Sequence, residues 1–293
     1  MSRTPFRLAL TGLAAGLSLA MSQPAARAAE GGVKPPALNW SFSGPLGKFD
    51  RAQLQRGFKV FKEVCSSCHG ASLIAFRNLS EPGGPEFTPG QVAALAATYQ
   101  IKDGPNDQGE MFERPGRPAD RFPSPFPNEQ AARAAQGGAY PPDFSVLAKA
   151  RTYVRGFPAF VFDIFTQYQE QGPDYIHALM VGYKDPPAGF PALLPGQNYN
   201  EYMPGHLIAM PKPLSDGQVE YPKGPDGKAQ VPETVDQYAR DVAAFMVWMA
   251  EPHLEQRKRI ALWFMPFLVI LAFLLYFSKK KIWSRMPDGS PAH

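Results

Sequence analysis

The only two cysteines of this 293-residue chain, Cys65 and Cys68, stand three positions apart, and His69 follows directly. Residues three apart share one face of a helical turn, so both thiols can bond to the vinyl groups of one porphyrin. The imidazole of the next residue can then ligate the iron, and C-x-x-C-H is the attachment signature of a c-type haem. We therefore predict one covalently bound haem c, with electron transfer as its chemistry.

Two other kinds of site use a similar pair of cysteines. A structural zinc site needs further ligands at a regular spacing, and the sequence offers no third cysteine. A dithiol redox site of the thioredoxin kind follows a buried strand in a βαβ unit, whereas residues 59–64 continue a helical repeat. The haem interpretation is favoured over both, because the remaining histidines also lack zinc-finger spacing: His177, His206, His253 and His293.

The second axial ligand of the iron decides whether the site carries electrons or reacts with small molecules. Met203, His206 and Met210 lie in one loop ahead of the last amphipathic segment. We favour Met210, because Pro211 and Pro213 fix the chain directly after it. Met203 and His206 remain the alternatives. A thioether stabilises the ferrous state relative to a second imidazole, so the predicted reduction potential is high.

Helical periodicity precedes the haem motif. Asp50 is a suitable N-cap, and apolar residues recur at helical spacing over residues 50–65, which places the motif on the last turn of a helix. Thr234 and Gln237 form a predicted capping box in front of a strongly amphipathic helix that Pro252 ends or kinks. Further helices are predicted at residues 88–99, 128–136, 160–168 and 175–183.

Two proline-rich segments separate these helices. Residues 81–142 hold 11 prolines and residues 183–232 hold 10 of the chain's 32. Their many aromatic residues argue for ordered loops, since disordered segments usually lack such residues. No strand pattern is longer than a possible short hairpin around residues 219–231. The predicted fold class is therefore mainly α: a class I cytochrome c-like haem domain with long proline-rich insertions, plus one C-terminal transmembrane helix.

The two ends of the chain predict export and anchoring. Residues 1–28 combine arginines, an apolar run and a small-residue cleavage site, which is typical of a secretory signal peptide. Residues 260–277 are uncharged and span about 27 Å as a helix, enough to cross the hydrocarbon of a bilayer. With its basic flanks this anchor covers 257–281. The predicted order is signal peptide, periplasmic haem c domain (29–256), anchor and cytoplasmic tail (282–293), in a bacterial inner membrane.

The net charge of +4 comes from the two ends of the chain. The leader carries +3 and the residues from 257 onward carry +6, which leaves −5 on the exported domain. An acidic surface near a haem would attract a basic soluble partner and repel nucleic acid, so no nucleic-acid partner is expected. Solubility alone explains the surplus of carboxylates equally well.

Several motifs in a fixed order resemble the cytochrome c1 family over about residues 49–283. Apart from the haem signature, no single motif is specific, but their order is hard to imitate. They are R-G-F at 56–58, D-G-P-N at 103–106, G-E-M-F at 109–112, R-P-G at 114–116, P-N at 127–128, A-A-R-A-A at 131–135, P-P-D at 141–143, A-E-P at 250–252 and R-K-R at 257–259.

The resemblance implies roles for four further residues. In the family, the methionine of a P-G-x-x-I-x-M loop is the sixth iron ligand, which corresponds to Met210. The arginine that follows P-P-D by several residues holds a haem propionate, which corresponds to Arg151, while Pro141 and Pro142 would pack on the porphyrin. The chain also departs from its relatives: residues 152–172 look longer than in mitochondrial members, residues 183–200 match loosely, and the extra cysteine pair of some bacterial members is missing.

The resemblance also implies a function. Family members are the haem subunit of the quinol-to-cytochrome c oxidoreductase, the bc1 complex, and pass electrons from the Rieske iron-sulfur protein to a soluble or membrane-tethered cytochrome c. Cytochrome b would be a further partner, in a dimeric complex that oxidises quinol and translocates protons, and this chain would perform no bond-making catalysis. Two alternatives stand: an anchored mono-haem subunit of a terminal oxidase, and a catalytic haem protein with an open sixth site.

Overall fold

The computed structural model describes residues 33–151, 171–225, 227 and 229–284. It is mainly helical, as predicted, with two small two-stranded sheets in this described part of the chain. The predicted signal peptide, the predicted helix at 160–168 and residues 285–293 of the predicted tail lie outside the described residues.

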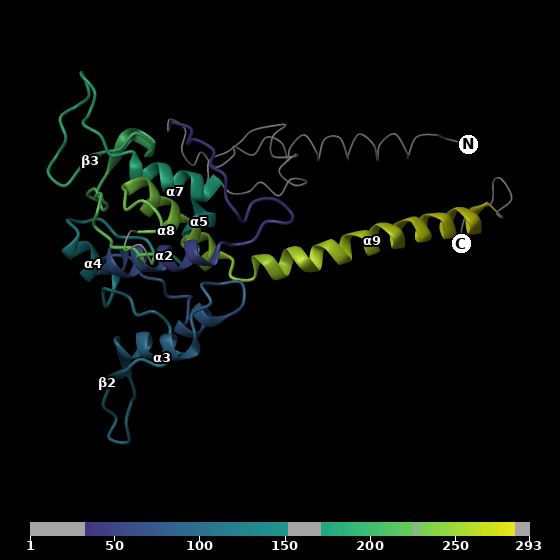
Figure 1. The fold of residues 1–293 in the computed structure, drawn as a ribbon, viewed down its shortest axis with the longest axis horizontal. Helices are drawn as coiled ribbons and strands as arrows, with labels where there is room; N and C mark the ends of the chain where they lie inside the picture. Colours follow the sequence, from purple (N-terminus) through teal and green to yellow (C-terminus); the bar gives the residue numbers. More distant parts are fainter. Residues whose placement is uncertain (1–32, 152–170, 226, 228, 285–293) are drawn as a thin grey trace, which may run out of the picture.

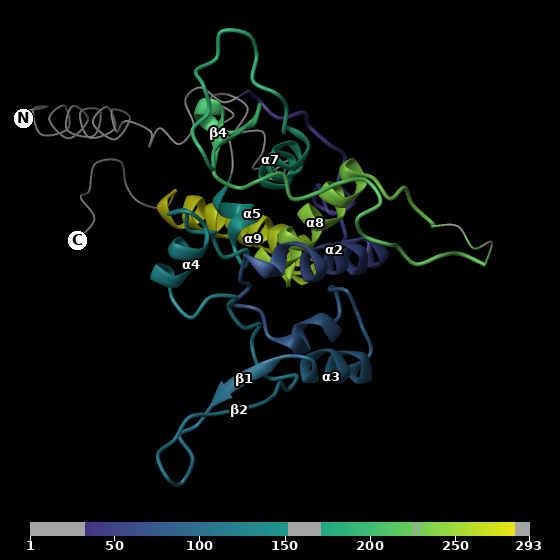
Figure 2. The same cartoon turned by 90° about the vertical axis from the view of Figure 1, so that its left-hand side faces the viewer.

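Two helices form the centre of the haem domain. α2 (Arg51–Glu63) begins behind Asp50, whose side chain accepts a hydrogen bond from the Gln53 amide, as predicted for an N-cap. α8 (Val235–Ala250) packs against it, and the two helices lie side by side in both views (Figures 1 and 2). The haem motif follows α2 directly, so this pair positions it.

A close approach and aromatic side chains hold α2 to α8. Gly57 has no side chain, and a Cβ there would lie 2.0 Å from the carbonyl oxygen of Asp241, so any larger residue would force the helices apart. Phe58 and Phe61 of α2 contact Phe245 of α8, with ring centroids 5.6 and 5.7 Å apart. All three rings are buried, so removal of aromatic surface from water stabilises this interface.

A buried charge pair lies at the same interface. The fully buried carboxylate of Asp241 accepts hydrogen bonds from Nε of Arg56 at 2.8 Å and from the hydroxyl of Tyr221 at 2.8 Å. It also accepts one from Nε2 of Gln237 at 2.9 Å. The predicted capping box is therefore only half formed: Thr234 accepts from the Gln237 amide, but the Gln237 side chain turns to the carboxylate. A buried charge needs donors more than an exposed helix end does.

Two further helices, α5 (Leu147–Ala150) and α7 (Gln171–Val181), also pack on α8. α7 begins before its predicted start at residue 175. His177 of α7 is buried, and its Nε2 lies 2.8 Å from the carboxylate of Asp236 at the start of α8. Burial lowers the pKa of His177, and the Asp236 carboxylate opposes that effect.

The first proline-rich segment is ordered, as its aromatic residues predicted. It contains α3 (Pro89–Ala97), β1 (Gln100–Asp103), β2 (Phe112–Pro115) and α4 (Glu129–Ala135). β1 and β2 pair antiparallel in a hairpin that projects from the domain (Figure 2). Sequence patterns do not predict this hairpin, because strands of four residues are too short to establish an alternation.

The second proline-rich segment carries the loop with the candidate methionines. Its strands β3 (Asn198–Tyr199) and β4 (Leu207–Ile208) pair antiparallel, with Met203 and His206 between them and Met210 directly after β4. They lie at the end of the domain away from the C-terminal helix (Figure 1). The hairpin predicted around residues 219–231 is reduced to a single bridge between Lys223 and Ala229.

The C-terminal helix α9 (Leu254–Trp283) leaves the domain as one long rod (Figure 1). Among the described residues it is the one helix long and apolar enough to cross a membrane, and its apolar window is not buried within the chain. The prediction of one C-terminal apolar helix of spanning length is confirmed.

Polar contacts join the start of α9 to the haem domain. The ammonium of Lys258 is buried and donates to the carbonyl oxygens of Phe42 at 2.5 Å and Gly44 at 2.6 Å. One turn earlier, the carboxylate of Glu255 accepts two hydrogen bonds from the guanidinium of Arg51, at 2.7 and 2.9 Å. The membrane-facing helix is thus fixed into the folded domain by its own side chains.

Candidate haem-binding site

The haem motif lies on a tight turn that follows α2. The α-helix ends at Glu63, and Cys65–Ser67 form a 3₁₀ turn. The amides of Cys68 and His69 both donate to the Cys65 carbonyl, at 3.1 and 2.9 Å. The sequence placed the motif on the last α-helical turn. The structure corrects this: the helix tightens to a 3₁₀ turn at its end, which keeps both thiols close together.

His69 is oriented by a backbone carbonyl. Its Nδ1 lies 2.8 Å from the carbonyl oxygen of Pro142. A carbonyl can only accept, so Nδ1 carries the proton and donates it. Burial lowers the pKa of His69, although the Pro142 bond and Asp143 oppose that effect. The ring is therefore neutral at pH 7, and the lone pair of Nε2 is left for a metal ion.

Residues 142–145 clamp the chain that follows the histidine. The ring of Phe144 stacks on His69, with centroids 4.2 Å apart, and its amide donates to the Gly70 carbonyl at 2.8 Å. The carboxylate of Asp143 accepts from the Ser72 amide at 2.9 Å. The imidazole is therefore held on one side by a ring and at one nitrogen by a carbonyl, which fixes the direction of the other nitrogen.

The two cysteines are free and half-buried. Burial, together with the neighbouring Cys68, raises the pKa of the Cys65 thiol to about 12. Dithiol redox sites depend on a lowered thiol pKa, so this environment argues against that alternative. No group of three or more histidine, cysteine, aspartate or glutamate residues suited to a metal ion occurs in the described ranges.

The loop with the candidate axial ligands turns at two residues with positive φ. Gly205 has φ +75° and His206 has φ +60°, within the 3₁₀ turn Pro204–His206. Glycine adopts this backbone region without strain, whereas a histidine there is uncommon. The His206 ring stacks on Tyr199 of β3, with centroids 5.5 Å apart. The turn reverses the chain so that β4 runs back along β3 towards Met210.

The two candidate methionines are held differently. The hydroxyl of Tyr175 donates to the sulfur of Met203 at 3.6 Å. Met210 is held by its backbone instead: its carbonyl oxygen accepts from the hydroxyl of Tyr183 at 3.0 Å and from Nδ2 of Asn198 at 3.3 Å. The sulfur of Met203 thus has a hydrogen-bond donor already, while the contacts of Met210 fix its position in the chain.

The model of the cytochrome C1 family matches residues 40–286. The chain belongs to this family. A cytochrome b/c1 of Bradyrhizobium diazoefficiens is 60% identical over 94% of this chain, which corresponds to 39% of that protein's length. The cytochrome c1 of Blastochloris viridis is 49% identical over 89% of this chain and 90% of its own length, and that of Rhodospirillum rubrum is 43% identical over 92% and 95%.

Cytochrome c1 proteins carry a covalently bound c-type haem and serve in electron transfer, and the residues of this chain fit such a group. Two free thiols stand at the attachment spacing, and the next residue is a neutral imidazole with its iron-facing nitrogen unprotonated. The predicted haem cofactor and electron-transfer function are therefore confirmed at the level of the family.

The structure brings some predicted site residues together and leaves others apart. Pro142 contacts the haem motif through its carbonyl oxygen, which lies 2.8 Å from Nδ1 of His69. Pro141 is half-buried beside it. Arg151 is exposed at the end of α5, and its charge acts on Tyr175, whose pKa is raised mainly by burial.

Other residues of the site were not predicted. Phe144 and the Pro142 carbonyl orient the histidine, and Gln136 donates to the sulfur of Cys68 at 3.5 Å. No local pattern marks such residues, because their partners are some 70 positions away. Tyr183 and Asn198 were missed for a different reason. They bind a backbone carbonyl, and because every residue type has one, the sequence does not mark the residue that they hold.

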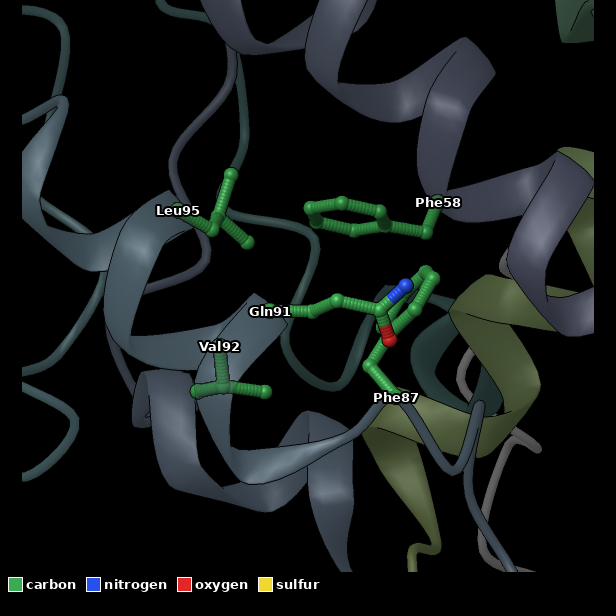
Figure 3. A pocket seen from close by; sticks show the side chains of 5 residues that line it. All are labelled: Phe58, Phe87, Gln91, Val92 and Leu95. Carbon is green, nitrogen blue, oxygen red and sulfur yellow. The ribbon is translucent and has the colours of Figure 1, made fainter.

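An apolar pocket of about 190 Å³ lies apart from the haem motif (Figure 3). Phe58 of α2 faces Val92 and Leu95 of α3 across it, and Phe87 and Gln91 complete the lining. None of the predicted site residues lines this pocket, so it belongs to the packing of α3 on α2 and not to the cofactor site.

Proposed function

We propose that this chain is the anchored cytochrome c1 subunit of a bc1 complex, which accepts electrons from a Rieske iron-sulfur protein and passes them to a soluble or membrane-tethered cytochrome c. The observation that carries the proposal is the imidazole of His69, oriented by the Pro142 carbonyl directly after two free thiols. A fixed, neutral imidazole is what a permanent iron ligand requires.

The residues divide the work of holding the cofactor. Cys65 and Cys68 attach the haem through thioether bonds, and His69 and Met210 ligate its iron. When bound, the haem supplies a one-electron redox centre. Because the chain itself provides both axial ligands, no substrate gains access to the metal, so this subunit transfers electrons without bond-making catalysis.

Three further residues act on the edge and face of the cofactor. Arg151 pairs with a haem propionate, for which a guanidinium offers two parallel hydrogen bonds. Its exposure leaves it free to do so. Pro141 and Pro142 pack against the porphyrin, and their half-buried position beside the haem motif supports this.

The complex and its topology are part of the proposal. The Bradyrhizobium relative is named cytochrome b/c1, and this chain matches 39% of its length, which supports cytochrome b as a neighbour. The complex is dimeric in this proposal. Residues 1–28 act as a signal peptide, 29–256 fold in the periplasm, 257–281 anchor the chain in the bacterial inner membrane and 282–293 remain in the cytoplasm. The basic clusters at both ends of the apolar stretch support the anchor.

Alanine at position 210 tests the axial ligand. In the purified haem protein, Met210→Ala should abolish the weak far-red absorption that a methionine-to-iron bond gives in the ferric state and should lower the midpoint potential sharply. Met203→Ala and His206→Ala are matched controls from the same loop, and both should leave that absorption in place. If one of them removes it and Met210→Ala does not, the ligand assignment moves to that residue.

Extraction of the full-length chain from membranes in mild detergent tests the complex. Cytochrome b and an iron-sulfur protein should co-purify with it. A copper-containing oxidase in their place would support the alternative role as a haem subunit of a terminal oxidase. Rapid binding of carbon monoxide by the untreated ferrous protein would support the other alternative, a catalytic haem protein with an open sixth site.

A further inference from the structure

Two side chains converge on the backbone of the proposed methionine ligand. The carbonyl oxygen of Met210 accepts from the Tyr183 hydroxyl at 3.0 Å and from Nδ2 of Asn198 at 3.3 Å. The same Asn198 amide also lies 3.5 Å from the carbonyl oxygen of Ile208. A carbonyl oxygen has two lone pairs, so two donors satisfy it fully and fix the peptide plane between residues 210 and 211.

These two donors belong to different parts of the fold. Tyr183 follows the end of α7, a helix that packs on α8, whereas Asn198 lies in β3. Burial raises the pKa of Tyr183, so its hydroxyl stays protonated and can donate. The Met210 peptide is therefore tied both to the helical core and to its own hairpin.

A fully buried side chain locks the donors into place. Nδ2 of Asn200 donates to the carbonyl of Leu179 in α7 at 2.7 Å, and its Oδ1 accepts from the amide of Tyr202 at 3.0 Å. The backbone amide of Asn200 donates to the carbonyl of His206 at 2.9 Å. Buried amides with all partners in place rigidify their surroundings. Asn200 and its hydrogen-bond partners, here called the methionine platform, thus connect the methionine loop to α7.

The chain has no covalent means of fixing this loop. Its only two cysteines are those of the haem motif, so no disulfide can cross-link the long segment between α7 and α8. Closing such a loop costs chain entropy, which noncovalent contacts must offset. The bonds from Tyr183 and Asn198 are the contacts that act on the ligand residue itself.

We propose that Tyr183 and Asn198 are positioning residues for the axial methionine: by holding the Met210 carbonyl, they keep its side chain in place to ligate the iron. The inference rests on the proposed role of Met210. By holding the backbone, the two residues govern how often the methionine leaves the iron.

Competition with an added ligand measures that opening. Imidazole binds ferric haem iron only when the methionine has left, so its apparent affinity rises in proportion to the open fraction. Loss of one hydrogen bond should raise the imidazole affinity about fivefold, and loss of both about 30-fold. The variants are Tyr183→Phe, which keeps the ring, Asn198→Ala, and the two combined, each measured in the covalently loaded haem protein by titration of the Soret absorption.

Tyr175→Phe is the matched control. Tyr175 is also a tyrosine of the α7 region whose hydroxyl reaches a methionine of the same loop, but its partner is the sulfur of Met203. This variant should change the imidazole affinity by less than twofold. If the Tyr183 and Asn198 variants also stay within twofold of the unaltered protein, the positioning role is wrong.

The outcomes separate the two proposals. Met210→Ala should bind imidazole most tightly of all; if it binds no more tightly than the unaltered protein, Met210 is not the ligand and the proposed function fails at that residue. If Met210→Ala behaves as expected and the positioning variants do not, only the present inference falls. Should the double variant fail to accumulate with covalent haem, the two single variants decide the question, because each removes one donor.

Discussion

Buried aromatic rings join α2 to α8 on the histidine side of the haem site, whereas on the methionine side two hydrogen bonds act on the proposed ligand residue itself. Phe58 and Phe61 bury their surface against Phe245, close behind the cysteines. Met210 lies in a loop fixed by Tyr183 and Asn198. Apolar burial is large and insensitive to direction, while each hydrogen bond contributes about 1 kcal/mol and depends on geometry.

The difference suggests that the two sides open at different free energies. The α2 and α8 pair should come apart only when the whole domain unfolds, whereas the methionine loop can leave its platform while the core stays intact. Variants on the two sides should therefore separate a change in the free energy of unfolding from a change in the opening of the methionine loop.

The largest effect is expected from Asp241→Ala. This change leaves the Arg56 guanidinium, which is 14% exposed, without its carboxylate, and breaking such a buried pair costs about 3–5 kcal/mol. The free energy of unfolding, measured by urea denaturation of the haem protein, should fall by that amount, while the imidazole affinity of the ferric protein stays unchanged. Tyr221→Phe removes only one bond to the same carboxylate and should cost about 1 kcal/mol.

Gly205→Ala should act on the loop alone. Its φ of +75° forces an alanine into the left-handed region at a cost of about 1–2 kcal/mol, with open space around the new Cβ. The imidazole affinity should rise about 5- to 30-fold, with little change in the urea midpoint. Gly189→Ala is the control, because φ is +85° there and the Cβ also meets open space, but the residue lies outside the methionine loop. A lower urea midpoint without tighter imidazole binding would contradict the predicted local opening.

The pH dependence of stability should report on His177, where α7 meets α8. Burial lowers the pKa of this histidine in the folded state, so below pH 6.5 the unfolded chain binds a proton that the folded chain does not. The free energy of unfolding should therefore fall on acidification from pH 6.5 to 5.5, by at most about 1.4 kcal/mol per pH unit. The groups that face the ring are Asp236, Arg240 and Asp174.

Two variants isolate this histidine. His177→Gln should reduce the slope in that window, because one of the two histidines whose pKa burial lowers is gone. Asp236→Asn should keep the slope, because the ring stays buried and loses the carboxylate that favours its charged form. An equal slope in His177→Gln and in the unaltered protein would mean that another group titrates there.

The smallest effect is expected from Lys184→Ala. The Lys184 ammonium lies 2.5 Å from the Glu201 carboxylate at the edge of the methionine platform, with both side chains in contact with water. Exposed ion pairs of this kind contribute little to stability and weaken further in salt. Neither the urea midpoint nor the imidazole affinity should change measurably. Imidazole binding as tight as in Asn198→Ala would instead place this pair among the contacts that hold the loop.

Sequence patterns predict the helical side better than the loop side. Asp50 ahead of an apolar helical repeat and Thr88 followed by Pro89 both predicted helix starts that the structure confirms. Those signals are local, since each cap involves residues within one turn. The haem signature at Cys65 and Cys68 is equally local, which is why it could be interpreted without a structure.

Partners that are distant in the sequence hold the loop side, and they also orient the histidine. The contact between Asn200 and Leu179 in the loop region spans 21 positions, and the one between His69 and Pro142 on the histidine side spans 73. No period or cap encodes such pairs. Gln237 illustrates the same limit inside a helix: its local pattern predicted a cap, but a buried carboxylate one turn further on takes its side chain instead.

The ammonium of Lys258 donates hydrogen bonds to carbonyl oxygens of residues 42–47. This contact has a consequence for how electrons reach the protein. An electron carrier whose folded domain is fixed to its own membrane anchor keeps its cofactor at a constant height and orientation relative to the lipid surface. The cofactor therefore does not diffuse between an electron donor and an electron acceptor. The electron donor and the electron acceptor must instead move to it.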